Sequence, residues 1–148
     1  MERVFFELEL DTWHGQSVES MWATKLGDHL YKIEGSPFFV KGITFEDAVK
    51  TKLLDGVISF VKTATSSGGS TYRILCKEGT DETQFERFWK PLEVVGCTYE
   101  QGDFGYRMYS VDVPKQANIQ QVFALLQDGI SNDIWDFEEG HCGHPIQG

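Results

Sequence analysis

The feature that most constrains the fold is a change in hydrophobic period at the short stretch SSGGS, residues 66–70. Before it, apolar and polar residues alternate in short runs, which is typical of β-strands. After it, two longer segments repeat apolar residues every three or four positions, as amphipathic helices do. The two glycines make the stretch a natural linker or sharp turn. We therefore predict an all-β part over 1–66 and an α+β part over 70–148, packed as one compact unit.

The first part is predicted to consist of short strands, which cover 4–11, 18–26, 29–35, 47–54 and 56–65. Gly27-Asp28 and Asp55-Gly56 are hairpin turn signals between pairs of these runs. Short strands with tight turns predict a small antiparallel β-barrel or a strongly curved sheet. Phe38 and Phe39 lie in the one longer connection, and we expect them to plug the barrel, because large apolar side chains are seldom left in water.

The second part is predicted to alternate strands and helices. Strands are expected at 71–78, 97–103, 106–114 and 133–138, with one helix after Asp81 and another after Asn118. This β-α-β-β-α-β order is that of a ferredoxin-like sandwich, in which both helices cover one face of an antiparallel sheet. The other face of the sheet is then free to pack on the first part.

The ends of the two helices are marked by capping residues. Asp81 with Gln84 resembles a capping box, and Asn118 is a typical N-cap. Pro91 falls inside the first helix, where it removes a backbone hydrogen bond, so we expect a kink or break near Lys90.

The charge of the chain is strongly acidic and unevenly distributed. The whole sequence has 13 basic and 23 acidic residues, for a net charge of −10. Residues 1–65 hold 7 basic and 10 acidic residues, and the rest hold 6 and 13. No cluster of Lys and Arg with aromatic residues indicates direct nucleic-acid binding. The field of the second part would steer a basic partner toward it, although a net negative charge also simply keeps a protein soluble.

Neither a membrane segment nor a disulfide framework is indicated. No run approaches the ~20 apolar residues of a membrane span. The start MERVFFELEL lacks the pattern of a secretion signal, so we expect a cytoplasmic protein. The three cysteines are irregularly spaced, and Cys76 and Cys97 lie in apolar runs where a free thiol behaves as a small core residue.

The stretch IWDFEEGHCGHP, residues 134–145, is the best candidate for chemistry. His141, Cys142 and His144 are residue types that bind zinc, but a structural zinc site needs four ligands. Alternatively, Glu139 and His141 lie on the same side if the strand continues, as an acid/base pair would. A purely structural role is also open, in which Trp135 and Phe137 anchor the last strand in the core.

Several other polar residues lie on the predicted strands and turns. His14 and His29 fall at turns, where we expect them to be solvated. Arg73, Lys77 and Arg107 fall on neighbouring strands of the second part. Cross-strand pairing with acidic residues explains them, and a small anion site on the open face of the sheet is the alternative.

The runs VESMWATKLGDHLYKIEGSPFFVKGITFEDAV, STYRI, VGC, YSVDVP and WDFEEGHCGHP, in this order and spacing, resemble a bacterial family of uncharacterised proteins. It is the domain-of-unknown-function family numbered 4265. The resemblance extends over nearly the whole chain. It implies no activity, cofactor or catalytic residue.

The charge and the lack of a catalytic motif favour a non-catalytic binding protein that docks a basic protein partner. An immunity protein that neutralises a nuclease-type toxin is the example we consider, and the predicted contact residues are Asp133, Asp136, Glu138 and Glu139. No cofactor is expected, and zinc is the only candidate. The alternatives are a metal-dependent or acid/base enzyme that uses EEGHCGHP, and a sensor that binds a small ligand between the two parts.

Overall fold

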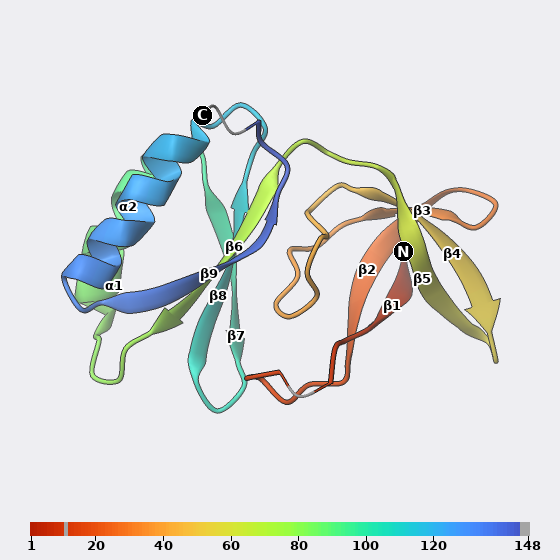
Figure 1. Cartoon of the computed structure of the whole chain (residues 1–148), viewed down its shortest axis with the longest axis horizontal. Helices are drawn as coiled ribbons and strands as arrows, with labels where there is room; N and C mark the ends of the chain where they lie inside the picture. Colours follow the sequence, from red (N-terminus) through yellow and green to blue (C-terminus); the bar gives the residue numbers. More distant parts are fainter. Residues whose placement is uncertain (11, 146–148) are drawn as a thin grey trace.

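A computed structural model describes residues 1–10 and 12–145 and has three layers (Figure 1). Two helices form one outer layer, a four-stranded sheet lies in the middle, and a five-stranded sheet lies on the other side. In both sheets, neighbouring strands run antiparallel, apart from one contact in the five-stranded sheet that is described below. The predicted mixed α+β class is confirmed.

The first sheet contains strands in sequence order, β1 (Glu2–Glu7), β2 (Val18–Gly27), β3 (Leu30–Ile33), β4 (Ala48–Leu54) and β5 (Val57–Thr65). Asp55 and Gly56 both have positive φ, 50° and 79°, as the tight β4–β5 hairpin requires. Register shifts in β2 and β4 add local bends. The sheet curves far enough for β1 and β5 to meet in parallel at one position, Phe5 opposite Ser59.

The second sheet contains β6 (Ser70–Cys76), β7 (Thr98–Asp103), β8 (Arg107–Val113) and β9 (Trp135–Cys142), in the spatial order β7-β8-β6-β9. Helix α1 (Glu82–Val94) follows β6, and helix α2 (Ile119–Ser131) follows β8. The element order β-α-β-β-α-β is therefore the predicted one.

The helix caps form as predicted, but Pro91 does not end α1. The Asp81 carboxylate accepts from the Gln84 amide, and the Gln84 side chain accepts from the Asp81 amide. Asn118 caps α2 in the same way, through the amide of Gln121. Helix α1 continues through Pro91 to Val94, because Leu92 is fully buried and holds this turn against the sheet. We expected a kink or a break near Lys90, and the break does not occur.

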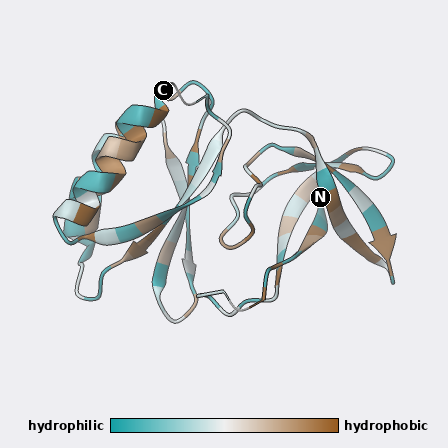
Figure 2. Cartoon of the chain, in the orientation of Figure 1, coloured by the Kyte–Doolittle hydropathy of each residue, from teal (hydrophilic) through white to brown (hydrophobic). Residues whose placement is uncertain are grey.

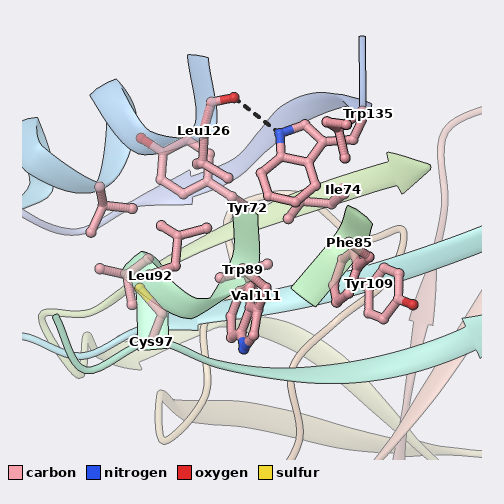
Figure 3. Packing of buried hydrophobic residues seen from close by; sticks show 13 residues of the cluster. Tyr72, Ile74, Phe85, Trp89, Leu92, Cys97, Tyr109, Val111, Leu126 and Trp135 are labelled. Carbon is pink, nitrogen blue, oxygen red and sulfur yellow. Dashed lines mark hydrogen bonds between the residues drawn. The ribbon is translucent and has the colours of Figure 1, made fainter. Parts of the chain in front are cut away.

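The main hydrophobic core lies between the helices and the second sheet (Figure 3). Figure 2 shows hydrophilic and hydrophobic bands alternating along α2, as expected for a helix with one buried face. Trp135 is fully buried, and its indole N–H donates to the carbonyl of Leu126 at 3.0 Å. A separate apolar cluster, with Phe6 and Ile33 among its members, fills the first sheet.

The two sheets meet through the long loop 34–47, which joins β3 to β4 and packs on the open face of the second sheet (Figure 1). The hydroxyl of Ser110 donates to the carbonyl of Pro37 at 2.6 Å and accepts from the hydroxyl of Ser36 at 2.7 Å. The amide of Gly42 donates to the carbonyl of Gly140 at 2.9 Å. Hydrogen bonds thus hold this loop on the second sheet.

Phe38 and Phe39 also lie in this loop, but they do not plug the first sheet. Both rings pack edge-on against Phe104 in the β7–β8 turn, with centroids 5.3 and 4.8 Å away. The expectation of a barrel plug was wrong, because the second sheet offers these rings an aromatic partner.

Neither helix in the described part of the chain is long and apolar enough to cross a lipid bilayer.

Candidate functional site

The C-terminal stretch forms β9, an outer strand of the second sheet. Trp135 enters the core, and the ring of Phe137 packs against Tyr72 and Phe123 at centroid distances of 6.0 and 5.7 Å. The predicted anchoring of this strand by two aromatic residues is confirmed.

His144 is buried and hydrogen-bonded through both ring nitrogens. Nε2 lies 2.9 Å from the carbonyl of Pro114, and Nδ1 lies 2.6 Å from the hydroxyl of Ser70. A carbonyl oxygen can only accept, so Nε2 carries the proton and Nδ1 accepts from Ser70. His144 therefore ties the end of β9 to the start of β6 and has no nitrogen left to bind a metal ion.

The predicted zinc ligands do not converge. The thiol of Cys142 lies 3.6 Å from the carbonyl of His144. Within residues 1–10 and 12–145, no three His, Cys, Asp or Glu side chains are arranged to hold a metal ion. The pairing of His144 with Ser70 and Pro114 is the physical reason.

The predicted acid/base pair is also separated. Glu139 is opposite Tyr72 on β6, whereas His141 is opposite the preceding residue, Thr71. Adjacent residues of a strand point to opposite faces of the sheet. The extra residue, Gly140, forms a bulge that turns His141 away from Glu139. The expectation that both lie on the same side was wrong.

The predicted partner-binding acids lie in two environments. Asp133 and Asp136 are exposed, and their carboxylates lie 3.9 and 3.2 Å from the amino group of Lys77. Glu139 is exposed on the helix side of the sheet. Glu138, in contrast, is partly buried and points toward the first sheet, where it meets Trp13.

Glu138 is held between an indole and a buried guanidinium. The indole N–H of Trp13 donates to Oε2 at 3.2 Å, and Nη1 of Arg73 lies 3.5 Å from Oε1. The Arg73 side chain is fully buried, and its Nη2 donates to the carbonyl of Val40. A Cβ on Gly140 would come within 3.0 Å of Nη1, so glycine leaves the room that this guanidinium needs.

A cleft of about 340 Å³ opens beside Glu138, at the junction of the two sheets. This volume lies near the lower end of the range for small-ligand sites. Its lining combines acidic, aromatic and aliphatic side chains with one lysine: Glu7, Leu8, Glu9, Thr12, Trp13, His14, Phe39, Val40, Lys41, Phe60 and Glu138.

His14 forms part of the cleft wall. Its ring centroid lies 4.7 Å from that of Phe39 and 5.5 Å from that of Trp13. Nδ1 accepts from the amide of Gln16 at 2.9 Å, so the proton of the neutral ring is on Nε2. Burial lowers the pKa of His14, and the nearby Glu138 only partly opposes this effect. His14 is thus neutral near pH 7 and partly buried, whereas we expected it to be solvated.

The part of the wall next to His14 is fixed by one carboxylate. Glu19 on β2 accepts from three consecutive amides, those of Phe38 at 2.7 Å, Phe39 at 3.0 Å and Val40 at 2.8 Å. Charged acceptors form stronger hydrogen bonds than neutral ones. Glu19 therefore holds the loop in the conformation that presents Phe39 to the cleft and the carbonyl of Val40 to Arg73.

The family model described as Domain of unknown function (DUF4265) matches residues 19–137. The chain belongs to this family. The DUF4265 match covers β2 to the middle of β9, so it includes Glu19, Val40 and Arg73 but ends one residue before Glu138. No curated protein matches the chain.

A solved structure has the same fold as this DUF4265 protein. It is described as a "Novel crystal structure of a hypothetical protein from Neisseria gonorrhoeae". The two superpose with a TM-score of 0.80 over 97% of this chain and 96% of that chain, at 16% sequence identity. At this identity the likeness extends to the fold alone.

Two of the three cysteines of the DUF4265 protein are poor nucleophiles. Burial raises the pKa of Cys76, and raises that of Cys97 to about 12, so both stay as weakly nucleophilic thiols. Neither cysteine lines the cleft. The cleft itself offers three carboxylates, aromatic rings, one amino group and the hydroxyl of Thr12.

Sequence reasoning named Glu138, His14 and Phe39 but did not predict that they meet in one cleft, and it missed Trp13 and Glu19. Trp13 and Glu138 are in contact although 125 positions separate them in the chain. Glu19 and Arg73 each fall in an ordinary strand pattern, with no motif around them. The only available signal was the presence of an aromatic pair, Trp13 and His14, in a predicted turn.

Proposed function

We propose that this protein is a non-catalytic binding protein whose second half docks a basic protein partner. The distribution of exposed charge carries the proposal. Of the 13 acidic residues after position 65, all but Asp112 and Glu138 are exposed. Of the 6 basic residues there, Arg73 is buried and Lys77 and Arg107 are partly buried.

The surface of the first half is different. Among its described residues, six acidic and six basic side chains are exposed, so its exposed charge is balanced. The second half exposes eleven acidic side chains against three basic ones. A basic partner would therefore be attracted to one half of the molecule, and the field would orient it during the encounter.

Several of these acidic side chains lie on or next to the helical layer. Glu82, Glu86 and Glu93 lie on α1, Asp133 follows α2, and Asp136 is the second residue of β9. In an immunity protein that neutralises a nuclease-type toxin, such carboxylates would occupy the basic groove in which the nuclease holds phosphates.

The experiment first captures the partner from an extract of the native host. It then compares the affinity of that partner for two variants that each lack three negative charges. The variant E86Q/E93Q/D133N removes three charges from the second half, and E2Q/D28N/D55N removes three from the first. We expect a stoichiometric basic partner whose affinity falls as salt rises. The first variant should bind it about tenfold more weakly, and the second within about twofold of wild type. Absence of a basic partner, or equal losses in both variants, would contradict the proposal.

We also infer a finer fold assignment, a ferredoxin-like sandwich for 70–148 and a small barrel for 1–66. The order β7-β8-β6-β9 supports the sandwich, because it places the first and third strands of that half in the centre. The parallel contact of β1 with β5 supports the barrel. Separate apolar clusters on each side of 66–70 support the boundary.

A further inference from the structure

The cleft beside Glu138 combines carboxylates with the exposed ring of Trp13, and carboxylates and aromatic rings together recognise organic cations. We propose that it binds the guanidinium group of an arginine side chain. This inference rests on the proposed function, because it takes that arginine to come from the basic partner. The cleft lies at the junction of the two sheets and is lined mainly by the first half, so an arginine of the partner would reach it from beyond the acidic surface of the second half.

Trp13 supplies the main ring face. Its side chain is 51% exposed, and none of the described lysine or arginine groups lies over it. Trp22 on β2 is equally exposed at 49%, but the guanidinium carbon of Arg3 lies 4.5 Å from its ring centroid. The chain thus covers one exposed tryptophan with its own arginine and leaves the other open toward a cleft.

The charge of the cleft is complementary to a cation. Three carboxylates line it, those of Glu7, Glu9 and Glu138, against the single amino group of Lys41. The negative charge of Glu138 is compensated by Arg73, whose Nη1 lies 3.5 Å from Oε1. Glu7 and Glu9 are exposed, and neither forms an ion pair with a described side chain. They are available to a ligand at the mouth of the cleft.

The site is already assembled without a ligand. Glu19 fixes Phe39 and Val40 through their amides, and Glu138 fixes the indole of Trp13. Binding would then require little ordering of the protein, which favours affinity. A guanidinium suits the site better than an ammonium, because its planar face stacks on an aromatic ring while its edge donates to carboxylates.

The direct test is an NMR titration of the full chain with Nα-acetyl-arginine amide, followed at the Trp13 indole and the amides of His14 and Phe39. Nα-acetyl-citrulline amide has the same shape without the charge, and Nα-acetyl-lysine amide has the charge without the planar head. We expect millimolar binding of the arginine probe at these signals. The lysine probe should bind about threefold and the citrulline probe about tenfold more weakly.

Two variants test whether the arginine probe binds in this cleft. E7Q/E9Q changes two exposed side chains, and W13L keeps an apolar residue but removes the ring. Each should weaken the arginine probe about fivefold, whereas D28N/D55N removes the same charge at two exposed turns outside the cleft and should leave its affinity unchanged. Equal binding of the citrulline probe, shifts confined to other surfaces, or equal losses in D28N/D55N would overturn the inference.

Failure here is distinguishable from failure of the proposed function. If a basic partner is captured and E7Q/E9Q and W13L bind it with wild-type affinity, the arginine site is wrong and the docking surface stands. If the arginine probe binds as expected but no basic partner exists, the site stands and the proposed function is wrong.

Discussion

The two faces of the second sheet are both buried, but by different means. On the helix side, Tyr72, Ile74 and Val111 contribute to an apolar core (Figure 3). On the opposite side, Arg73 and Ser110 are equally inaccessible to water, and each donates a hydrogen bond to a carbonyl of the loop 34–47. Alternate residues of the same strands therefore support two kinds of interface.

This difference determines which changes each face can tolerate. An apolar core is sensitive to volume, because its atoms are close-packed in every direction. A polar interface is sensitive to the loss of a partner, because an unsatisfied buried group keeps its desolvation penalty. Substitutions on the two faces should therefore differ in how much unfolding free energy they cost and in which region of the chain they loosen.

The largest effect is expected for Gly129→Ala on the helix side. A Cβ at this position would lie 2.1 Å from Cε2 of Trp135, and Trp135 is fully buried with its indole bonded to Leu126. The ring has no free space to move into. We expect the free energy of unfolding to fall by about 3 kcal/mol, measured by urea denaturation.

Gly27→Ala is the matched control, because its Cβ would meet no atom within 4 Å. Its unfolding free energy should stay within about 0.5 kcal/mol of wild type. Equal losses in both variants would show that the packing around Trp135 is looser than the structure indicates.

Arg73→Met should have the next largest effect, on the polar face. Methionine fills much of the volume but leaves the carbonyl of Val40 without its donor, and a buried acceptor without a partner costs about 2 kcal/mol. Amide hydrogen exchange should speed up most at Gly42, whose amide bonds to Gly140 across the same interface. The amide of Ile74 should change only with global stability. Uniform acceleration across β6 would contradict a role confined to this contact.

The strand pattern predicted the order of elements, the helices on one face of the second sheet and the first part against the other face. It did not predict which segment of the first part makes that contact. Only the fold shows that loop 34–47 covers the face that carries Arg73 and Ser110. For the same reason Phe38 and Phe39 were assigned to the wrong cavity, since their partner Phe104 is more than sixty positions away.

The C-terminal stretch shows the limit of composition as a guide. Residue types suggested zinc, but Ser70 and Pro114 hydrogen-bond both ring nitrogens of His144. One inserted glycine, Gly140, reverses the face of the sheet on which His141 lies. Bulges and long-range partners leave no periodic signal in a sequence. Anchoring by Trp135 and Phe137 was predictable because it depends on local alternation alone.

Ser110→Ala should have a smaller effect than Arg73→Met on the same face. The hydroxyl donates to Pro37 and accepts from Ser36, and the removal of a buried neutral hydrogen bond costs about 1–2 kcal/mol. Ser59→Ala removes a hydroxyl that bonds the carbonyl of Val57 at 3.3 Å on an exposed strand, and should be neutral. Thermal unfolding of the two variants side by side measures the difference. A Ser110→Ala protein as stable as wild type would mean that water replaces the hydroxyl and that the interface is wet.

The smallest effect, and one of opposite sign, is expected for Asp112→Asn at the edge of the polar face. Burial, with the nearby carboxylates of Glu46 and Glu100, raises the pKa of Asp112 to about 6 from an ordinary value of 3.8. The folded protein therefore binds a proton at this group more tightly than the unfolded chain does. Between these two pH values the stability of the wild type falls as pH rises, and above about 6 the full penalty of the buried charge is present.

Asparagine keeps the shape and removes the charge, so the variant should be more stable than wild type above pH 6, by about 1 kcal/mol after screening by solvent. The advantage should shrink as pH falls and vanish below the ordinary pKa of an aspartate, where both proteins are neutral at this position. Unfolding free energies at a series of pH values from 4 to 8 measure this. An advantage independent of pH would mean that shape rather than charge limits this corner of the interface, and Asp112 would then be a poor probe of the difference between the two faces.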